Sequence, residues 1–278
     1  MNLPDFLCIG AQKAGTTWLH KMLQGHRDVF LGPFKEYQFF NSLFVPRHRR
    51  WTGWHVKMSL EKSIRNHLDQ KGPTHFQFLK RLVTLGEDEF MFSEDWYRLI
   101  YTTPGAIGKI KGDITPEYCT IPEHGIEYVQ KLLGPVPVVY IIRDPLSRAL
   151  SQLRMNINRK KTDQKPTKDE WLQLVDDWDI ANRGDYQTNI TRWLAKYPND
   201  KLLFIPYRDI STDPISVLRR VEAHIGLPAG EYPDAGERIH EGAKIVVPDN
   251  ATAKMRELVE PQYAFLNKQF GSDFCSRL

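Results

Sequence analysis

Two glycines, a lysine and paired threonines at residues 10–17 have the spacing of a loop that binds phosphate groups. The stretch, GAQKAGTT, nearly satisfies the pattern G-x-x-x-x-G-K-[ST]. Thr16 stands at the position of the lysine in that pattern, and Lys13 lies in the middle of the loop. Backbone N–H groups and the start of a following helix would still bind an anion there. The displaced lysine changes which atoms of the ligand it can reach, whereas a plain strand-to-helix turn would leave it unexplained.

A second anion-binding turn follows the apolar stretch 136–142, VPVVYII, which is typical of a buried strand. The stretch leads into Arg143, and side chains at the carboxyl end of a parallel strand face the ligand crevice of such a sheet. An arginine there suits a phosphate group. Asp144-Pro145 is a good N-cap and first position for a helix, and Ser151 would lie on that helix.

The two turns together predict a nucleotide that carries phosphates at two places. A P-loop nucleoside triphosphatase usually has an aspartate at the end of an apolar strand that helps to hold Mg²⁺. Arg143 stands at that point in this chain, and Asp144 is explained more simply as an N-cap. The nine histidines show no metal-ligand spacing. The sequence therefore predicts two anion sites and no obvious metal site.

Strand-to-helix units position these turns. Strands are predicted at 6–9, 136–142 and 201–207, and helices at 17–23, 145–156, 214–225 and 251–270. The alternation predicts an α/β fold, in which 1–278 forms a single domain with a central mostly parallel sheet, P-loop-like, and helices on both faces. The aromatic-rich region 51–101 is predicted to be mainly helical, within an insertion at about 41–105 that covers the substrate.

The composition is that of an ordinary globular protein. Of 278 residues, 41% are apolar and 26% charged, and the net charge of +4 is too small to indicate nucleic acid as a partner. Cys8, Cys119 and Cys275 lack the spacing of a disulfide framework or a zinc site. No apolar run approaches the ~18 residues that cross a bilayer, and no signal segment is recognisable. We therefore expect a cytoplasmic protein, or the soluble catalytic domain of a longer chain.

Four segments resemble the sulfotransferases that use 3′-phosphoadenosine 5′-phosphosulfate (PAPS). QKAGTTWL, residues 12–19, is similar to that family's 5′-phosphosulfate loop, and RDPLSRALSQ, residues 143–152, to its 3′-phosphate motif. DITPEY, residues 113–118, resembles a segment that lines the cleft, and residues 202–227 resemble the later strand and helix. The order and separation of the two phosphate motifs also match, and jointly they are specific. The resemblance covers most of the chain, weakly over 41–105.

The resemblance implies the P-loop-like sulfotransferase fold, with PAPS as sulfuryl donor, adenosine 3′,5′-bisphosphate (PAP) as product and no metal required. It implies that Lys13 contacts the 5′-phosphate and the bridging oxygen of the leaving group. Arg143 and Ser151 would hold the 3′-phosphate, and Trp18 would lie at the edge of this site. The implied cofactor-binding residues are Lys13, Ala14, Gly15, Thr16, Thr17, Trp18, Arg143 and Ser151.

KEYQFF, residues 35–40, resembles the Lys-Glu segment of the carbohydrate-type branch of this family, in which the glutamate is the general base. Glu36 is therefore the predicted base, and Lys13 the second catalytic residue. The aryl and steroid branch uses a histidine after a later strand, and neither His124 nor Asp113 lies in a version of that motif. The predicted reaction is in-line transfer of a sulfuryl group from PAPS to a hydroxyl or amine of a small molecule, carbohydrate or lipid.

Two other functions fit parts of the pattern. A P-loop kinase or NTPase with a degenerate loop would need ATP, Mg²⁺ and a carboxylate that binds the metal. A non-catalytic nucleotide-binding module would keep the fold and would not depend on Glu36.

Overall fold

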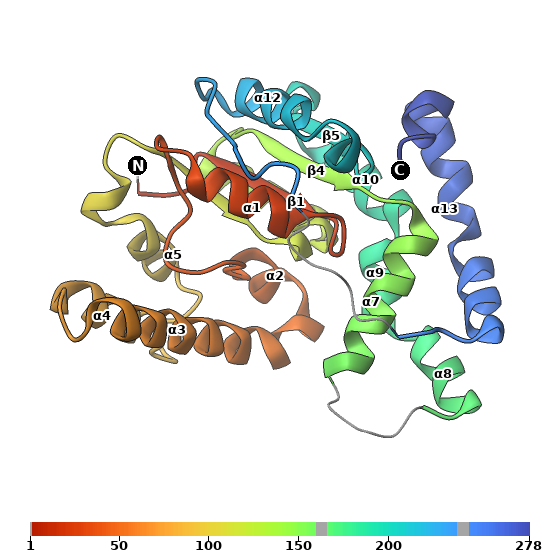
Figure 1. The fold of residues 1–278 in the computed structure, drawn as a ribbon, viewed down its shortest axis with the longest axis horizontal. Coiled ribbons are helices and arrows are strands. Elements are labelled where there is room, and N and C mark those ends of the chain that lie inside the picture. Colours follow the sequence, from red (N-terminus) through yellow and green to blue (C-terminus); the bar gives the residue numbers. More distant parts are fainter. Residues whose placement is uncertain (1, 160–165, 238–244) are drawn as a thin grey trace.

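A five-stranded parallel sheet forms the centre of the protein, in the order β2-β3-β1-β4-β5 (Figure 1). The computed structural model describes residues 2–159, 166–237 and 245–278. Its strands are β1 (Phe6–Gly10), β2 (Val29–Phe30), β3 (Ile110–Ile114), β4 (Val138–Ile142) and β5 (Leu202–Pro206). β1 lies between β3 and β4, so the loops that leave the carboxyl ends of β1 and β4 start next to each other.

Helices cover both faces of the sheet. The connections β1 to β2 and β3 to β4 run in opposite directions along the sheet, so right-handed crossovers put their helices on opposite faces. Figure 1 shows α1 in front of the sheet, and α6 packs on α10 across the other face. The helices are α1 (Thr16–Gly25), α2 (Phe39–Phe44), α3 (Arg49–Lys71), α4 (Phe76–Thr84), α5 (Glu94–Tyr101), α6 (Glu123–Leu133), α7 (Pro145–Arg159), α8 (Lys168–Val175), α9 (Trp178–Gly184), α10 (Tyr186–Lys196), α11 (Asp209–Thr212), α12 (Pro214–Ile225) and α13 (Asp249–Cys275).

The predicted α/β fold with a parallel sheet is confirmed. The predicted strand-to-helix units are present as β1–α1 and β4–α7, and as β5 followed by α12. The N-cap expected at Asp144 is also present, because its Oδ1 accepts a hydrogen bond of 2.7 Å from the Ser147 N–H. Gly226 ends α12 in the left-handed conformation, with φ of 75°, as a helix-terminating glycine does.

Two strands, β2 and β3, were missing from the sequence prediction. β2 has only two residues, which is too short for a periodic signal. β3 reads IKGDI, so a lysine, a glycine and an aspartate interrupt any apolar run. Asp113 can lie in this buried strand because Tyr97 and Tyr118 donate hydrogen bonds of 2.7 Å to its Oδ2 and Thr115 donates one of 2.6 Å to its Oδ1. Tertiary hydrogen bonds, which no local pattern reports, therefore stabilise this strand.

The region 41–105 is largely helical and contributes to the core. Its helices α3 and α4 run along one edge of the molecule (Figure 1). The aromatic residues of α5 are buried, and Tyr97 stacks on Phe39 with ring centroids 4.3 Å apart. Other aromatic residues, such as Trp54 of α3, are exposed. Over the part of the chain that the structure describes, none of the helices combines the length and the apolar character that a membrane span needs.

Candidate active site

The loop after β1 leaves the N-terminus of α1 uncapped. Gly15 is the N-cap residue, with φ of 84°, and among the described residues no side-chain hydrogen bond caps the helix, whose first turn also lacks acidic residues. A Cβ atom on Gly15 would lie 2.8 Å from Ile210 Cδ1 and 3.3 Å from Tyr207 Cε2. Glycine is therefore required there both by conformation and by close approach. The N–H groups without a partner among the described residues, together with the helix dipole, make this point suited to an anion.

Lys13 and Arg143, from the two predicted anion-binding turns, lie together. Arg143 Nη1 donates a hydrogen bond of 2.7 Å to the Lys13 carbonyl, and its guanidinium lies 4.6 Å from the centroid of the Tyr207 ring. Tyr186 holds the backbone of Arg143, since its hydroxyl accepts from the Arg143 N–H and donates to the Arg143 carbonyl. Burial and the positive charge of Arg143 lower the pKa of Lys13. Two cations this close favour an anionic ligand, which would offset their repulsion.

Glu36 lies beside the same loop. Lys35 Nζ is 2.6 Å from Glu36 Oε1 and 3.5 Å from Thr16 Oγ1, so it links the carboxylate to the start of α1. Burial raises the pKa of Glu36, but the positive charge of Lys35, with His55 and a hydrogen bond from Lys35, lowers it below its ordinary value overall. The side chain is 22% exposed. Glu36 is thus an ionised and accessible carboxylate next to the anion-binding loop.

The remaining predicted site residues differ in what they offer a ligand. The Ala14 N–H is bound to the Ala11 carbonyl at 3.1 Å, whereas Thr17 is half-buried in the first turn of α1. Trp18 is 6% exposed, and its Nε1 donates to the Ala235 carbonyl at 2.9 Å, so only its ring is available. Ser151 is half-buried on α7, and within the described residues its side chain makes no hydrogen bond.

Beyond Glu36 the structure places a polar network that sequence reasoning missed. Gln12 Nε2 donates to Glu117 Oε1 at 2.8 Å, and Gln38 Nε2 lies 3.3 Å from both Glu117 Oε2 and Glu36 Oε2. Arg183 of α9 lies 3.7 Å from Glu117. Gln12, Gln38 and Glu117 lie inside the segments QKAGTTWL, KEYQFF and DITPEY, so the sequence could have indicated them. Arg183 had no local signal, because only the packing of α9 brings it here.

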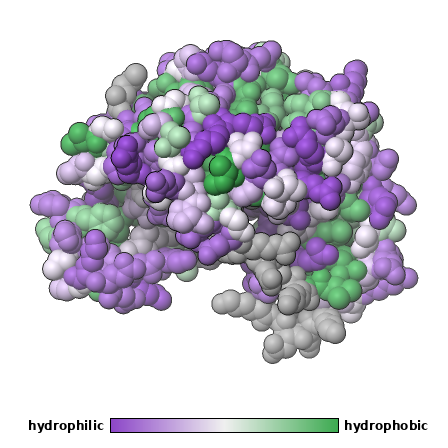
Figure 2. Space-filling model, turned by 45° about the horizontal axis from the view of Figure 1, so that its top comes forward, coloured by the Kyte–Doolittle hydropathy of each residue, from purple (hydrophilic) through white to green (hydrophobic). Residues whose placement is uncertain are grey.

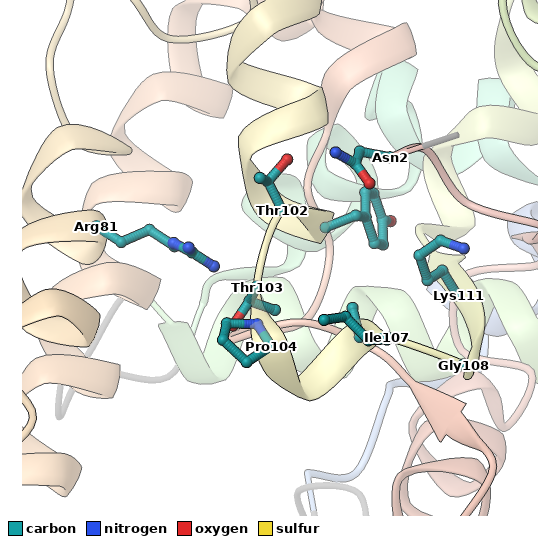
Figure 3. Close-up of a pocket in the computed structure, with 10 residues that line it drawn as sticks. Asn2, Arg81, Thr102, Thr103, Pro104, Ile107, Gly108 and Lys111 are labelled. Atoms are coloured by element: carbon teal, nitrogen blue, oxygen red, sulfur yellow. The ribbon is translucent and has the colours of Figure 1, made fainter.

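One cavity lies elsewhere in the fold. It has a volume of about 590 Å³ and is lined by residues that include Asn2, Arg81, Thr102 and Lys111 (Figure 3). Asn2 precedes β1 and Lys111 is near the start of β3, so this cavity is at the amino edge of the parallel strands. Ligands of open α/β sheets bind at the carboxyl edge, where Lys13, Arg143 and Glu36 lie. Over the described ranges 2–159, 166–237 and 245–278, no three His, Cys, Asp or Glu side chains form a group that could hold a metal ion.

Comparison with known proteins identifies relatives of the chain. Human bifunctional heparan sulfate N-deacetylase/N-sulfotransferase 2 is 23% identical over 243 residues, which cover 81% of this chain and 22% of that protein. Mouse heparan sulfate glucosamine 3-O-sulfotransferase 3B1 is 25% identical over 138 residues, which cover 48% of this chain and 35% of that protein. The chain thus spans roughly a fifth to a third of the length of these relatives.

Solved structures show the same fold. A sulfotransferase from Alicyclobacillus acidocaldarius superimposes with a TM-score of 0.64 at 18% identity, over 96% of this chain and 95% of that one. The sulfotransferase domain of the Synechococcus PCC 7002 olefin synthase gives a TM-score of 0.57 at 16% identity, over 93% and 94% of the two chains. The model of the sulfotransferase family matches residues 4–231, which is most of the sequence. The chain therefore belongs to the sulfotransferase family, and its relatives are of the carbohydrate type.

Proposed function

We propose that this protein transfers a sulfuryl group from PAPS to a hydroxyl or amine acceptor, with Glu36 as general base. The observation that carries the proposal is the convergence of three features at the carboxyl edge of the sheet. These are the uncapped N-terminus of α1, the adjacent Lys13 and Arg143, and the ionised Glu36 that Lys35 links to Thr16. Together they offer two places for phosphate groups and a carboxylate beside one of them.

The residues of the two turns fit the donor. PAPS, when bound, supplies a sulfuryl group attached to a good leaving group, a phosphate. The N–H groups at Gly15, Thr16 and Thr17 would bind the 5′-phosphate, in a loop whose close packing on Ile210 and Tyr207 requires glycine at position 15. Lys13 would stabilise negative charge on the leaving oxygen. Arg143, together with Ser151, would bind the 3′-phosphate, and the ring of Trp18 would close one side.

Glu36 has the properties that the base needs. It is ionised at neutral pH because Lys35 and His55 outweigh its burial, and it is open enough to meet an acceptor. A general base must lie within hydrogen-bond reach of the proton that it takes. Lys35 would hold the carboxylate in place and tie it to the donor loop. The helices of 41–105 would cover the acceptor, since α3 carries His55 next to Glu36.

The class of acceptor is inferred from the relatives. Two of them are named for N- and 3-O-sulfation of heparan sulfate, so a carbohydrate hydroxyl or amine is the acceptor class that we propose. Thr16 at the position of the NTPase lysine gives no support to the kinase alternative.

The test is product formation from PAPS. The protein is incubated with PAPS and a panel of saccharides, and PAP release and acceptor sulfation are followed together by mass spectrometry. We expect sulfated product in proportion to PAP. Phosphorylated acceptor from ATP with Mg²⁺, and none from PAPS, would refute the proposal in favour of a kinase.

The pH dependence of turnover should respond to Lys35. Lys35→Met removes the largest influence that lowers the pKa of Glu36 and leaves the burial that raises it. The pKa of Glu36 should therefore rise, and because the protonated carboxyl cannot act as base, the acid limb of kcat/KM should move to higher pH. The measurement is a kcat/KM–pH profile. Lys57→Met, on exposed Lys57 of α3, is the control and should leave the limb in place; an unmoved limb in Lys35→Met would contradict this role of Lys35.

A further inference from the structure

Arg183 is a buried cation whose contacts with the protein are all long. Its side chain is 7% exposed, and its nitrogens lie 3.4 Å from Gln12 Oε1, 3.7 Å from Glu117 Oε1 and 3.8 Å from Asp179 Oδ1. Well-made guanidinium–carboxylate hydrogen bonds measure about 2.7–2.9 Å. Its Nε is buried and has no hydrogen-bond partner in the described part of the chain. Buried donors are normally satisfied, so this nitrogen is available to an oxygen atom of a ligand.

Two more unsatisfied donors lie next to Arg183, on α3. Trp51 Nε1 and His55 Nε2 are buried without a hydrogen-bond partner among the described residues. The Arg183 guanidinium is 5.7 Å from the centroid of the Trp51 ring, whose centroid is 6.1 Å from that of His55. His55 Nε2 is in turn 4.0 Å from Glu36 Oε2. The unsatisfied donors therefore form a continuous row that ends at the proposed base.

An unsatisfied acceptor completes the set. Gln38 Oε1 is buried without a partner in the described ranges, while the amide nitrogen of the same side chain lies 3.3 Å from Glu36. Figure 2 shows the molecule hollowed beside the lobe that contains α3 and α4. A group that both donates and accepts hydrogen bonds, as a hydroxyl does, matches this mixture of donors and acceptor.

The charges around the row are already balanced. Three carboxylates, Glu36, Glu117 and Asp179, face the cations Lys35 and Arg183, and the charge of Arg50 also acts on Asp179. Burial raises the pKa of Asp179, but His48, 3.6 Å away, and the charge of Arg183 lower it overall, so Asp179 is ionised at neutral pH. A carboxylate or sulfate of an acceptor would thus enter a site without surplus positive charge, at a cost in desolvation.

Two exposed arginines flank the start of α3. Arg47 stacks on Trp178, with its guanidinium 4.8 Å from the ring centroid, and Arg50 is exposed. The charge of Arg50 acts on the row, because it helps to lower the pKa of Asp179.

We infer that the acceptor unit that meets Glu36 is an uncharged polyhydroxyl unit, such as a neutral sugar, and that Arg183 is a specificity-determining residue that binds one of its oxygens. This inference rests on the proposed sulfuryl transfer. It gives the chain an acceptor unlike the anionic polysaccharide for which its relatives are named.

The test compares matched acceptors that differ in charge. Sulfation from PAPS is measured with p-nitrophenyl β-glucoside, with the corresponding glucuronide, which carries a carboxylate at carbon 6, and with the xyloside, which lacks carbon 6. We expect kcat/KM for both neutral glycosides to exceed that for the glucuronide by about tenfold or more. Preference for the glucuronide would overturn the inference, as would transfer to none of the three by protein that still binds PAP. Failure to bind PAP would instead overturn the proposed function.

Variants test the residues of the row. Glu117→Gln removes one negative charge at constant size and should reduce the ratio of kcat/KM for the neutral glycosides to that for the glucuronide several-fold. Glu61→Gln, on exposed Glu61 of α3, should not change this ratio.

Arg183→Gln should raise KM for the neutral glycoside ~3- to 10-fold, as the loss of one hydrogen bond predicts, with little change in kcat or PAP affinity. Should Arg183→Gln fail to bind PAP, Trp51→Phe keeps an aromatic ring, loses the N–H and should raise KM in the same way. Unchanged KM in a variant that binds PAP overturns the assignment.

Discussion

Glu36→Gln should lower kcat by ~10²- to 10⁴-fold, the usual contribution of a positioned general base, while PAP binds with unchanged affinity. The amide has the size of the carboxyl but cannot take the proton of the acceptor. Glu36 reaches the donor loop through Lys35, which keeps its own contact with Thr16 in the variant, and through the amide of Gln38. This variant should therefore lose turnover while it keeps its affinity for the nucleotide. The measurements are kcat with saturating PAPS and a calorimetric titration with PAP.

The control for this variant is Glu61→Gln, a change of the same kind on an exposed face of α3. It should leave both quantities unchanged. Retained turnover in Glu36→Gln would remove Glu36 as the base. That result would agree with a protein that binds the nucleotide and does not depend on this carboxylate.

Lys13→Met should lower both catalysis and nucleotide affinity. The loss of a group that stabilises developing negative charge costs about 10²- to 10³-fold in kcat. Lys13 also supplies positive charge to the nucleotide in the ground state. It lies half-buried beside Arg143, and its burial and the charge of Arg143 lower its pKa. The affinity for PAP should therefore fall as well, which distinguishes this variant from Glu36→Gln. Turnover assays measure the change in kcat, and calorimetry measures the change in PAP affinity.

Lys21→Met is the matched control for Lys13→Met. Lys21 is on α1, is largely exposed and pairs with Glu237 at 3.2 Å, away from the loop. Exposed ion pairs contribute little, so its loss should change neither kcat nor PAP affinity. Wild-type kcat in Lys13→Met would show that the displaced lysine does not act on the leaving group.

The units that carry the phosphate turns could be predicted from the sequence because their strands are fully buried. Val138–Ile142 is apolar at every position, and Asp144 with Pro145 marks where the helix begins. β3 could not be predicted in this way, since its Asp113 depends on hydroxyl groups from α5 and from the turn that follows the strand. Local pattern is thus sufficient where burial alone selects a strand, and insufficient where distant hydrogen bonds do.

The residues of the candidate site also divide into those that local sequence predicts and those that only the tertiary structure brings together. Lys13 and Arg143 follow from loops at strand ends, where residue type and spacing limit what can bind, whereas Glu36 follows from the resemblance of KEYQFF to the carbohydrate-type branch. Lys35 was not among the predicted site residues, yet its ammonium lies between Thr16 and Glu36. Arg183 is 171 residues from Gln12 in the chain and meets it only because α9 packs on α7 and on residues 116–120. Groups that meet from separate elements need the tertiary structure.

Binding of the bisphosphate tests the central claim most directly. PAP is titrated into the protein in a calorimeter without metal, and ATP with Mg²⁺ is titrated in parallel. The uncapped start of α1 and the neighbouring Lys13 and Arg143 predict tight metal-free binding of PAP and little binding of ATP. Binding of ATP that requires Mg²⁺, with none of PAP, would contradict the account and assign the loop to a kinase or NTPase.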